Sequence, residues 1–200
     1  YIFVYQDVRG RYMSEGTFTN MTPQVAHKTK KDVDESTDTY DTIEWLLKNI
    51  ANNNGKVGQY GTSYPGFYTA AGTISEHPAL VASSPQAPIS DFWNDDFLHN
   101  GRFMLGYFRT FPVFGVQKTK PENKAWYMDT FVKQTSEDGL KFYRDMGTLK
   151  DGYEKYYKDN FFMTEIMNHP NYDEFWQKRN ILPHLKNIKH AVMTVGGWFD

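Results

Sequence analysis

The sequence contains no cysteine, which excludes disulfide bonds and thiolate metal sites. This absence leaves the cellular compartment open, because disulfide-free proteins occur on both sides of a membrane. No apolar run approaches the roughly 20 residues of a membrane-spanning helix, and the sequence shows no repeat and no low-complexity tract. A membrane-spanning protein and a repeat architecture are therefore not indicated.

The chain also lacks an excess of either charge. Its 22 basic and 24 acidic residues leave a net charge of −2. This balance gives no electrostatic reason to expect nucleic acid or an anionic membrane as a partner. The 200 residues, 40% of them hydrophobic, are enough for one core of ordinary size or a core with a subdomain.

Strand-like and helix-like segments alternate through the first part of the chain. Tyr1–Gln6 is apolar and β-branched or aromatic, and it predicts a buried strand. Apolar residues recur at intervals of three and four over Asp38–Ile50, which predicts a helix with Ser36 or Thr37 as its cap. Further strands are predicted over residues 56–60, 80–87 and 190–196. This order is typical of a parallel sheet covered by helices, with functional groups at the carboxyl ends of the strands. Asp7, Ser63 and Asp200 each follow such a segment and are expected at that edge.

The segment Gly61-Thr62-Ser63-Tyr64-Pro65-Gly66 joins the predicted strand 56–60 to a predicted helix that stops near His77-Pro78. A serine on a tight strand-to-helix turn is the nucleophile elbow of α/β-hydrolases. Its glycines suit a strained turn, and Pro65 suits the first turn of a helix. The spacing G-x-S-x-x-G is one residue longer than the general G-x-S-x-G form, so an ordinary turn stays open on this motif alone.

Aromatic residues are concentrated between residues 97 and 180, where the alternation of strands and helices stops. Helical patterns over 126–134, 139–146 and 172–178 predict an inserted helical cap. The predicted domains are residues 1–96 and 181–200 as the core and 97–180 as the cap. A second aromatic core without a role at the site is the alternative. Because the chain begins inside one strand-like run and stops after another, we expect it to be an internal piece of a longer protein.

Nucleophilic catalysis by serine also requires a base and an acid that orients it. In α/β-hydrolases the acid follows the nucleophile along the chain, and the histidine follows the acid. Asp200, which follows the last predicted strand, fits the acid. All six histidines precede Asp200, and we interpret them as structural or solvated.

Several blocks, in order along the chain, resemble the signatures of one family of serine hydrolases. They are 6-QDVRGRYMSEG-16, 38-DTYDTIEWL-46 with 54-NGKVG-58, 61-GTSYPGF-67, 77-HPAL-80 and 197-GWFD-200. The family is that of cocaine esterase, α-amino acid ester hydrolases and X-Pro dipeptidyl peptidases. Its elbow has the longer spacing seen here. The resemblance implies an α/β-hydrolase core, a parallel sheet with helices on both faces, with an inserted helical cap.

The resemblance also implies roles for individual residues. Ser63 would be the acylated nucleophile, Asp200 the acid of the triad, and the backbone N–H of Tyr64 one donor of the oxyanion hole. A second donor, a tyrosine hydroxyl, is expected upstream of Tyr1. The histidine is expected downstream of Asp200, ahead of a C-terminal jelly-roll domain. No metal and no organic cofactor are implied.

Three carboxylates lie close together in Asp91-Phe92-Trp93-Asn94-Asp95-Asp96. In the amino acid ester hydrolases an aspartate near this point helps to bind the α-ammonium group of the substrate. The resemblance, with a one-residue gap allowed, implies that Asp96 takes that position here, with Asp95 as the alternative. A carboxylate in a partly dry pocket pairs well with an ammonium ion. The alternative is that Asp91 and Asp95 cap a helix, which we prefer for Asp91.

The sequence thus predicts a serine hydrolase that cleaves an ester or amide bond, most similar to an α-amino acid ester hydrolase or acylase. X-Pro dipeptidyl peptidase activity is the alternative within enzymes, and an inactive hydrolase fold used for binding is the alternative outside them. The expected partner is a small ester, amide or short-peptide substrate. Homo-oligomerisation is left open. The resemblance favours a periplasmic or secreted protein, whereas composition leaves the compartment undetermined.

Overall fold

The computed structural model describes residues 1–26, 29, 31–118, 120–124, 132–133 and 137–199. Their contacts form two compact units. One, here called the sheet unit, comprises residues 1–3, 21–100 and 174–199, and the other, the aromatic unit, comprises residues 4–20 and 101–173. These units are clusters of contacts, and the predicted boundaries of core and cap stay a prediction.

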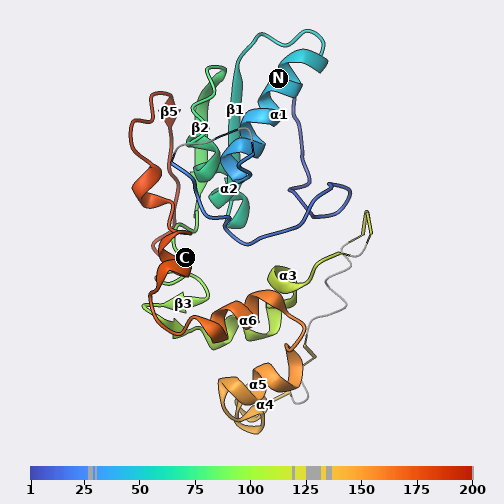
Figure 1. Cartoon of the computed structure of the whole chain (residues 1–200), viewed down its shortest axis with the longest axis vertical. Coiled ribbons are helices and arrows are strands. Elements are labelled where there is room, and N and C mark those ends of the chain that lie inside the picture. Colours follow the sequence, from blue (N-terminus) through green and yellow to red (C-terminus); the bar gives the residue numbers. More distant parts are fainter. Residues whose placement is uncertain (27–28, 30, 119, 125–131, 134–136, 200) are drawn as a thin grey trace. The chain divides into compact units, whose positions relative to one another are not determined.

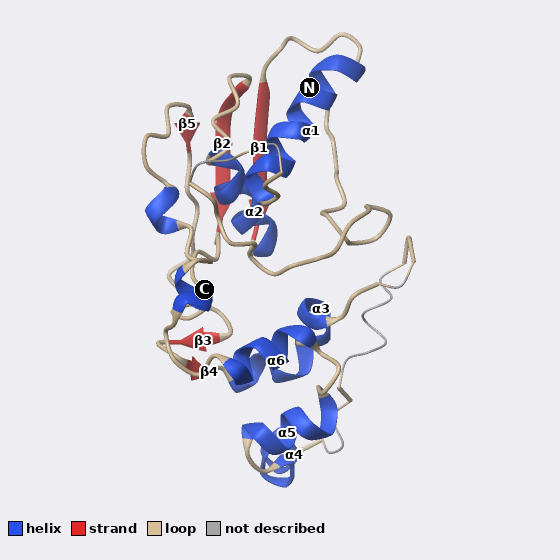
Figure 2. Cartoon of the chain, viewed as in Figure 1, coloured by secondary structure: helices blue, strands red, loops and turns tan. Residues whose placement is uncertain are grey.

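A parallel sheet of three strands organises the sheet unit. Strand β1 (Val57–Thr62) pairs with β2 (Leu80–Gln86), and β2 pairs with β5 (Ala191–Val192), which gives the order β1-β2-β5. A bridge between Gln86 and Val195 extends the last pairing beyond β5. The parallel pairing confirms the predicted α/β class, and Figure 2 shows the strands side by side.

Helix α2 (Tyr64–Thr73) packs against β1 and β2, and helix α1 (Glu35–Asn49) packs against α2. Figure 1 shows both helices beside the two strands. The α2 sequence is rich in small and apolar residues and is buried from Gly66 to Thr73, apart from Tyr68. Because α2 buries several sides of its surface, it needs neighbours on both the sheet and α1.

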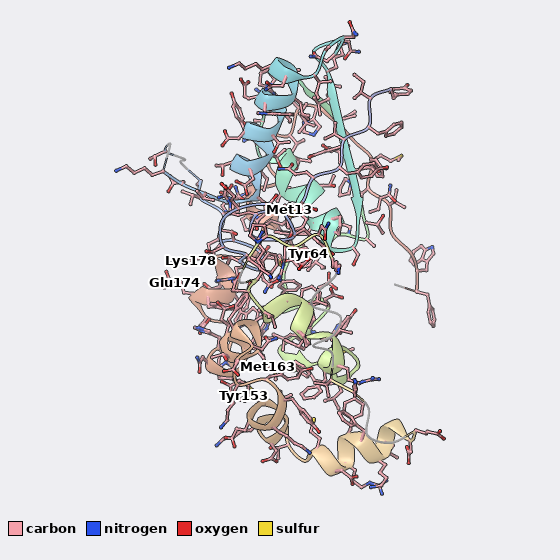
Figure 3. All side chains as sticks on the ribbon, turned by 90° about the vertical axis from the view of Figure 1, so that its right-hand side faces the viewer. Met13, Tyr64, Tyr153, Met163, Glu174 and Lys178 are labelled. Carbon is pink, nitrogen blue, oxygen red and sulfur yellow. The ribbon has the colours of Figure 1, made fainter. Side chains whose placement is uncertain are left out.

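Short elements complete the sheet unit. They are β3 (Leu98–His99), α7 (Glu174–Gln177) and a 3₁₀ turn (Leu182–His184). The ring of Trp176 in α7 packs against Trp93 with centroids 5.7 Å apart, and Ile181 N donates to Ser90 O at 3.2 Å. Figure 3 shows the exposed pair of Glu174 and Lys178, whose charged atoms lie 2.6 Å apart.

The aromatic unit contains β4, a 3₁₀ helix and four α-helices among its described residues. Their bounds are β4 (Arg102–Phe103), the 3₁₀ helix (Leu105–Thr110), α3 (Pro112–Gly115), α4 (Gly139–Met146), α5 (Leu149–Tyr156) and α6 (Phe161–Asn168). Rings fill its core: Phe111 is fully buried, stacked on Phe103 at 5.3 Å and on Phe162 at 5.7 Å between centroids. Arg11 joins the loop of residues 4–20 to this core, because its guanidinium donates to the carbonyls of Val113 and Val116.

The prediction of a strand over residues 1–6 is wrong. This segment forms no strand, and its side chains are exposed, with Phe3 at 70% and Tyr5 at 88%. An apolar run becomes a strand only where a neighbouring strand accepts and donates its backbone hydrogen bonds, and no described strand does so here. The expectation for Asp7 fails with it. Asp7 lies in the aromatic unit, where its carboxylate accepts a 3.3 Å hydrogen bond from Met13 N.

Helix α1 begins three residues earlier than predicted, and its cap is Asp34, not Ser36 or Thr37. The Asp34 carboxylate accepts from Ser36 N at 3.0 Å and from Thr37 N at 2.9 Å. The Thr37 hydroxyl in turn accepts from Asp34 N at 2.9 Å. This reciprocal capping box satisfies the first N–H groups of the helix without any apolar signal, which is why hydrophobic spacing placed the start too late.

The helix predictions in the second half of the chain differ in outcome. The prediction over 139–146 matches α4, whereas α7 is shorter than the predicted segment 172–178. The prediction over 126–134 lies almost entirely outside the described residues. None of the described helices is long and apolar enough to cross a membrane.

Candidate active site

Ser63 lies directly between the end of β1 and the start of α2, as the motif predicted. Its backbone has φ 64° and ψ −124°, a conformation that only glycine adopts without strain. Ser63 N donates to Gln86 O on β2 at 2.9 Å, and Phe67 N donates to Ser63 O at 3.0 Å. The turn is therefore held at both ends by backbone hydrogen bonds. Strain of this kind is the geometric mark of a nucleophile elbow, which exposes the serine at the carboxyl edge of a sheet.

The two glycines of the motif allow the elbow to pack against its own turn and against β2. A Cβ atom on Gly66 would lie 2.3 Å from Gln86 O and 3.2 Å from Gly61 O. A Cβ atom on Gly61 would lie 2.3 Å from Pro65 O. These neighbours are backbone atoms that cannot rotate away. Steric close approach therefore explains both glycines, as the sequence suggested.

Ser63 is exposed, and the next residue, Tyr64, begins α2. Tyr64 is labelled in Figure 3. The first N–H groups of a helix point beyond its end, toward the site where an oxyanion would form at the serine. This position is consistent with the predicted role of Tyr64 N–H, which stays a prediction. The hydroxyl of Tyr64 is buried and accepts from Met21 N at 3.3 Å. Burial raises the pKa of this hydroxyl well above its usual range, and Tyr68 and Glu35 add to the rise.

Sequence reasoning missed Glu35, which lies close enough to Tyr64 to act on its hydroxyl electrostatically. Its Oε1 atom accepts from Thr22 N at 3.0 Å, and burial raises the pKa of its carboxyl to about 7. A glutamate in the first turn of a helix normally indicates only a favourable interaction with the helix dipole. No pattern in the sequence marks this one as buried.

The structure does not test the role of Asp200, which lies outside the described residues. The chain leading to it does reach the same edge of the sheet as Ser63. Val195 N donates to Pro85 O at 3.1 Å, and Ala87 N donates to Val195 O at 2.8 Å. Residues 193–195 thus follow β2 to its carboxyl end, next to the strand that ends at the elbow. Asp200 stays the predicted acid.

Three histidines have structural partners. His77 Nδ1 accepts from Ala79 N at 3.0 Å, so its proton is on Nε2, which donates to Glu44 Oε1 at 2.8 Å. His190 Nε2 lies 2.8 Å from the Ser83 hydroxyl, and burial lowers its pKa. His169 Nδ1 lies 2.6 Å from Asp173 Oδ2 in the aromatic unit. These contacts agree with the structural interpretation of these histidines.

The acidic segment 91–96 does not form the expected helix. Asp91 is buried and accepts from Trp93 N at 2.9 Å, from the Asn94 amide at 2.9 Å and from the Asn180 amide at 3.1 Å. Asp91 therefore caps a turn and joins it to the segment after α7. Asp96 is half-buried, with a backbone φ of 67°. A left-handed backbone is uncommon for residues other than glycine, although aspartate adopts it more readily than most.

Metal ligation finds no support in the part of the chain that is described. No three histidine, aspartate or glutamate side chains gather there in a way that could hold a metal ion.

The whole chain, residues 1–200, matches the profile of a family described as X-Pro dipeptidyl-peptidase (S15 family). Among curated proteins it is similar to a cocaine esterase from Rhodococcus sp. (strain MB1 Bresler), with 25% identity over 214 aligned residues. That alignment covers 100% of this chain and 34% of the esterase.

Two solved structures resemble the chain closely. An α-amino acid ester hydrolase is 30% identical, with a TM-score of 0.80 over 96% of this chain and 30% of its own. An aminopeptidase from the marine sediment archaeon Thaumarchaeota archaeon is 34% identical, with a TM-score of 0.83 over 98% of this chain and 32% of its own. The chain thus spans about a third of the length of these relatives. Their likeness confirms the fold as that of an α/β-hydrolase core.

Proposed function

Because the chain belongs to the X-Pro dipeptidyl-peptidase (S15) family, we propose that it carries the nucleophile of a hydrolase that cleaves ester or amide bonds. The observation that carries this proposal is the backbone of Ser63, with φ 64° and ψ −124° between a parallel strand and a helix. A strained serine at this point costs folding free energy and is of no evident use to the sheet itself. Exposure of a nucleophile at the strand end accounts for it.

In the proposed mechanism Ser63 Oγ attacks the carbonyl carbon of the substrate and gives its proton to a histidine that follows Asp200 in the longer protein. The tetrahedral oxyanion accepts a hydrogen bond from Tyr64 N–H, and Asp200 holds the imidazolium in place. The protonated histidine then gives its proton to the departing alcohol or amine. Water, deprotonated by the same histidine, releases the acid product from the acyl-enzyme and restores Ser63.

We propose that the substrate carries a free α-amino group. The names of the two similar structures, an α-amino acid ester hydrolase and an aminopeptidase, describe enzymes that act on amino acid derivatives. In this chain the carboxylate proposed to bind the ammonium group is Asp96, which is half-buried and has a backbone φ of 67°. Partial burial strengthens pairing of a carboxylate with an ammonium ion.

Two alternatives follow from the same residues. An X-Pro dipeptidyl peptidase would also need a site for an amino terminus, so Asp96 does not separate it from an amino acid ester hydrolase. The family description favours the peptidase, and the curated esterase favours ester cleavage. An inactive binding protein of the same fold is distinguished by the sequence after Asp200, which would then contain no histidine within the next few dozen residues.

Fluorophosphonate labelling of the full-length protein tests the nucleophile. The expected result is one label, on Ser63, with Ser63→Ala abolishing both the label and ester hydrolysis, a loss of roughly 10⁴- to 10⁶-fold in kcat. The neighbouring hydroxyl in Thr62→Ala serves as the control and should leave the label in place. A label on another residue, or hydrolysis that survives Ser63→Ala, would remove the proposed mechanism.

The role of Asp96 is tested by comparing two substrates. Asp96→Asn removes the negative charge with little change in shape, so kcat/KM for an α-amino ester should fall about 10- to 100-fold. The matched ester without the amine should be hydrolysed at the unchanged rate. Asp95→Asn is the control for charge at the adjacent position. An equal loss on both esters would take Asp96 out of the ammonium site.

A further inference from the structure

Two successive backbone N–H groups in the loop before α1 donate to two different side chains. Met21 N donates to the Tyr64 hydroxyl at 3.3 Å, and Thr22 N donates to Glu35 Oε1 at 3.0 Å. Met21 is fully buried. Residues 21–22 therefore form a bridge between the first turn of α1, which carries Glu35, and the first turn of α2, which begins at the elbow.

The environment of Glu35 does not suit an ionised carboxylate. Its Oε2 atom is shielded from solvent and has no hydrogen-bond partner among the described residues. Among the described residues, the titratable groups that act on Glu35 or on Tyr64 include Asp34, the cap of α1, and Tyr68 on α2, and neither of them carries a positive charge. Hydrogen bonds from Thr22 favour the charged form of Glu35, but burial outweighs them. An ionised carboxylate that is buried without a cation costs free energy, and protonation removes that cost.

We propose that Glu35, in its neutral form, is a positioning residue for the oxyanion hole: it fixes residues 21–22, which fix the phenol of Tyr64 and so the backbone N–H of the same residue. This inference rests on the proposed function of the elbow and adds to it a residue more than 25 positions away in the sequence. Glu35 does not touch the substrate. It acts through the backbone of Thr22 and Met21 on the residue that donates to the oxyanion.

Ionisation of Glu35 should loosen this arrangement. Burial places the pKa of its carboxyl at about 7, so the neutral form prevails in mildly acidic solution and the charged form in mildly alkaline solution. The charged form beside the Tyr64 hydroxyl draws in water or moves toward solvent, and residues 21–22 move with it. A displaced oxyanion donor lowers kcat more than it raises KM, because its hydrogen bond strengthens only in the transition state.

The test compares kcat of the full-length enzyme with that of Glu35→Gln between pH 6 and pH 8.5. The glutamine amide keeps an acceptor for Thr22 N and remains neutral throughout. We expect the ratio of the variant's kcat to the wild-type kcat to lie near one at pH 6 and to rise about three- to tenfold at pH 8.5, with KM within twofold. Because the catalytic histidine is common to both proteins, its own titration cancels in this ratio. Asp41→Asn, an exposed carboxylate on the same helix, is the matched control and should give a ratio of one at every pH.

A ratio that does not change with pH would overturn the inference, because a purely structural role of Glu35 predicts a constant effect.

Tyr64→Phe provides a second measurement. This substitution keeps the backbone N–H of residue 64 and removes the hydroxyl that accepts from Met21 N. Its kcat should fall about fivefold or more with KM unchanged. When Glu35→Gln is added to Tyr64→Phe, the ratio of the double variant's kcat to that of Tyr64→Phe alone should not change with pH. An unchanged kcat in Tyr64→Phe would contradict the inference. Labelling of Ser63 in the wild-type enzyme separates the two proposals: labelling with a flat ratio refutes only the role of Glu35, whereas absence of labelling refutes the proposed function.

Discussion

Different interactions predominate in holding residues in place in the sheet unit and in the aromatic unit. Around the elbow, positions are fixed by backbone contacts and by polar side chains with defined partners. The Gln59 amide donates to Thr69 O at 2.9 Å and to the Ser83 hydroxyl at 3.0 Å, and that hydroxyl lies 2.8 Å from His190 Nε2. This network joins β1, α2, β2 and the residue before β5. Hydrogen bonds of fixed length and direction leave a satisfied network few alternative arrangements.

The aromatic unit depends more on ring packing, beside buried hydrogen bonds such as that from the Asn160 amide to Phe111 O at 3.1 Å. Phe108 lies 4.9 Å from Tyr157 between centroids, and Phe111 stacks on Phe162 at 5.7 Å. Ring contacts of this kind are strong because they bury a large area, but several orientations have similar energy. The comparison suggests that accurate geometry is concentrated at the elbow, where a proposed nucleophile needs it, and that the aromatic unit needs volume more than exact placement.

The largest expected effect is in the aromatic unit. Phe111→Ala should lower the free energy of unfolding by about 3–5 kcal/mol, because the ring is fully buried and its removal leaves a cavity. Phe111→Leu should recover all but about 1–2 kcal/mol, because a side chain of similar volume can repack. Urea denaturation of both variants measures the difference.

The control for this prediction is Leu140→Ala, at a side chain that is 67% exposed in α4. It should change stability by about 0.5 kcal/mol or less. If Phe111→Leu cost as much as Phe111→Ala, the aromatic unit would require exact placement of its rings, and the contrast between the two units would fail.

The next effect is the pH dependence of stability that Glu35 introduces. Its pKa is raised from 4.5 in the unfolded chain to about 7 in the fold, so the folded protein binds the proton more tightly. Stability is therefore unaffected by this group below about pH 4.5 and falls as the pH rises through 7, by up to about 3 kcal/mol. Glu35→Gln should remove this slope and unfold at a higher urea concentration than the wild type at pH 8.

The control is again Asp41→Asn, which should keep the wild-type slope. A Glu35→Gln variant that loses stability in parallel with the wild type between pH 5 and pH 8 would show that Glu35 ionises normally in the fold. The fold would then not disfavour ionisation of the Glu35 carboxyl, and the inference about the oxyanion donor would lose its physical basis.

The elbow could be predicted from the sequence because its chemistry is local. Gly61, Ser63 and Gly66 lie within six residues, and together with the strand-like run before them and the helical run after them they indicate a strained turn; the motif alone left an ordinary turn open. The flanking strand and helix were placed by apolar runs of ordinary length. The first helix was found by its periodicity, but its start was not, because the Asp34 cap is a polar interaction that hydrophobic spacing does not register.

The remaining features depend on contacts between residues that are distant in the sequence. Residues 1–6 look like a strand in composition, but a strand also needs a neighbour, which composition cannot supply. Asp91 was interpreted as a helix cap, whereas its partner Asn180 comes from a segment 89 positions away. Glu35 was overlooked because burial of a carboxyl depends on the loop that covers it and on α2. Such long-range relations are not visible in one sequence.

The smallest expected effect tests whether the elbow tolerates added volume. In Gly66→Ala the new methyl group would lie 2.3 Å from Gln86 O, a backbone atom that also accepts the hydrogen bond from Ser63 N. Either the turn or β2 must shift, which should cost about 2 kcal/mol in unfolding free energy. In the matched variant Gly58→Ala, on β1, the new methyl group meets its nearest atom, Ala82 O on β2, only at 3.8 Å, and the variant should leave stability within about 0.5 kcal/mol. The two variants add the same methyl group, so the difference between their stabilities isolates the effect of the close approach at Gly66.

Because the shift displaces Ser63, fluorophosphonate labelling of the full-length Gly66→Ala protein should slow more than its loss of stability explains. Equal behaviour of the two alanine variants would mean that the elbow can relax, and that accurate backbone placement is not what distinguishes the sheet unit from the aromatic one.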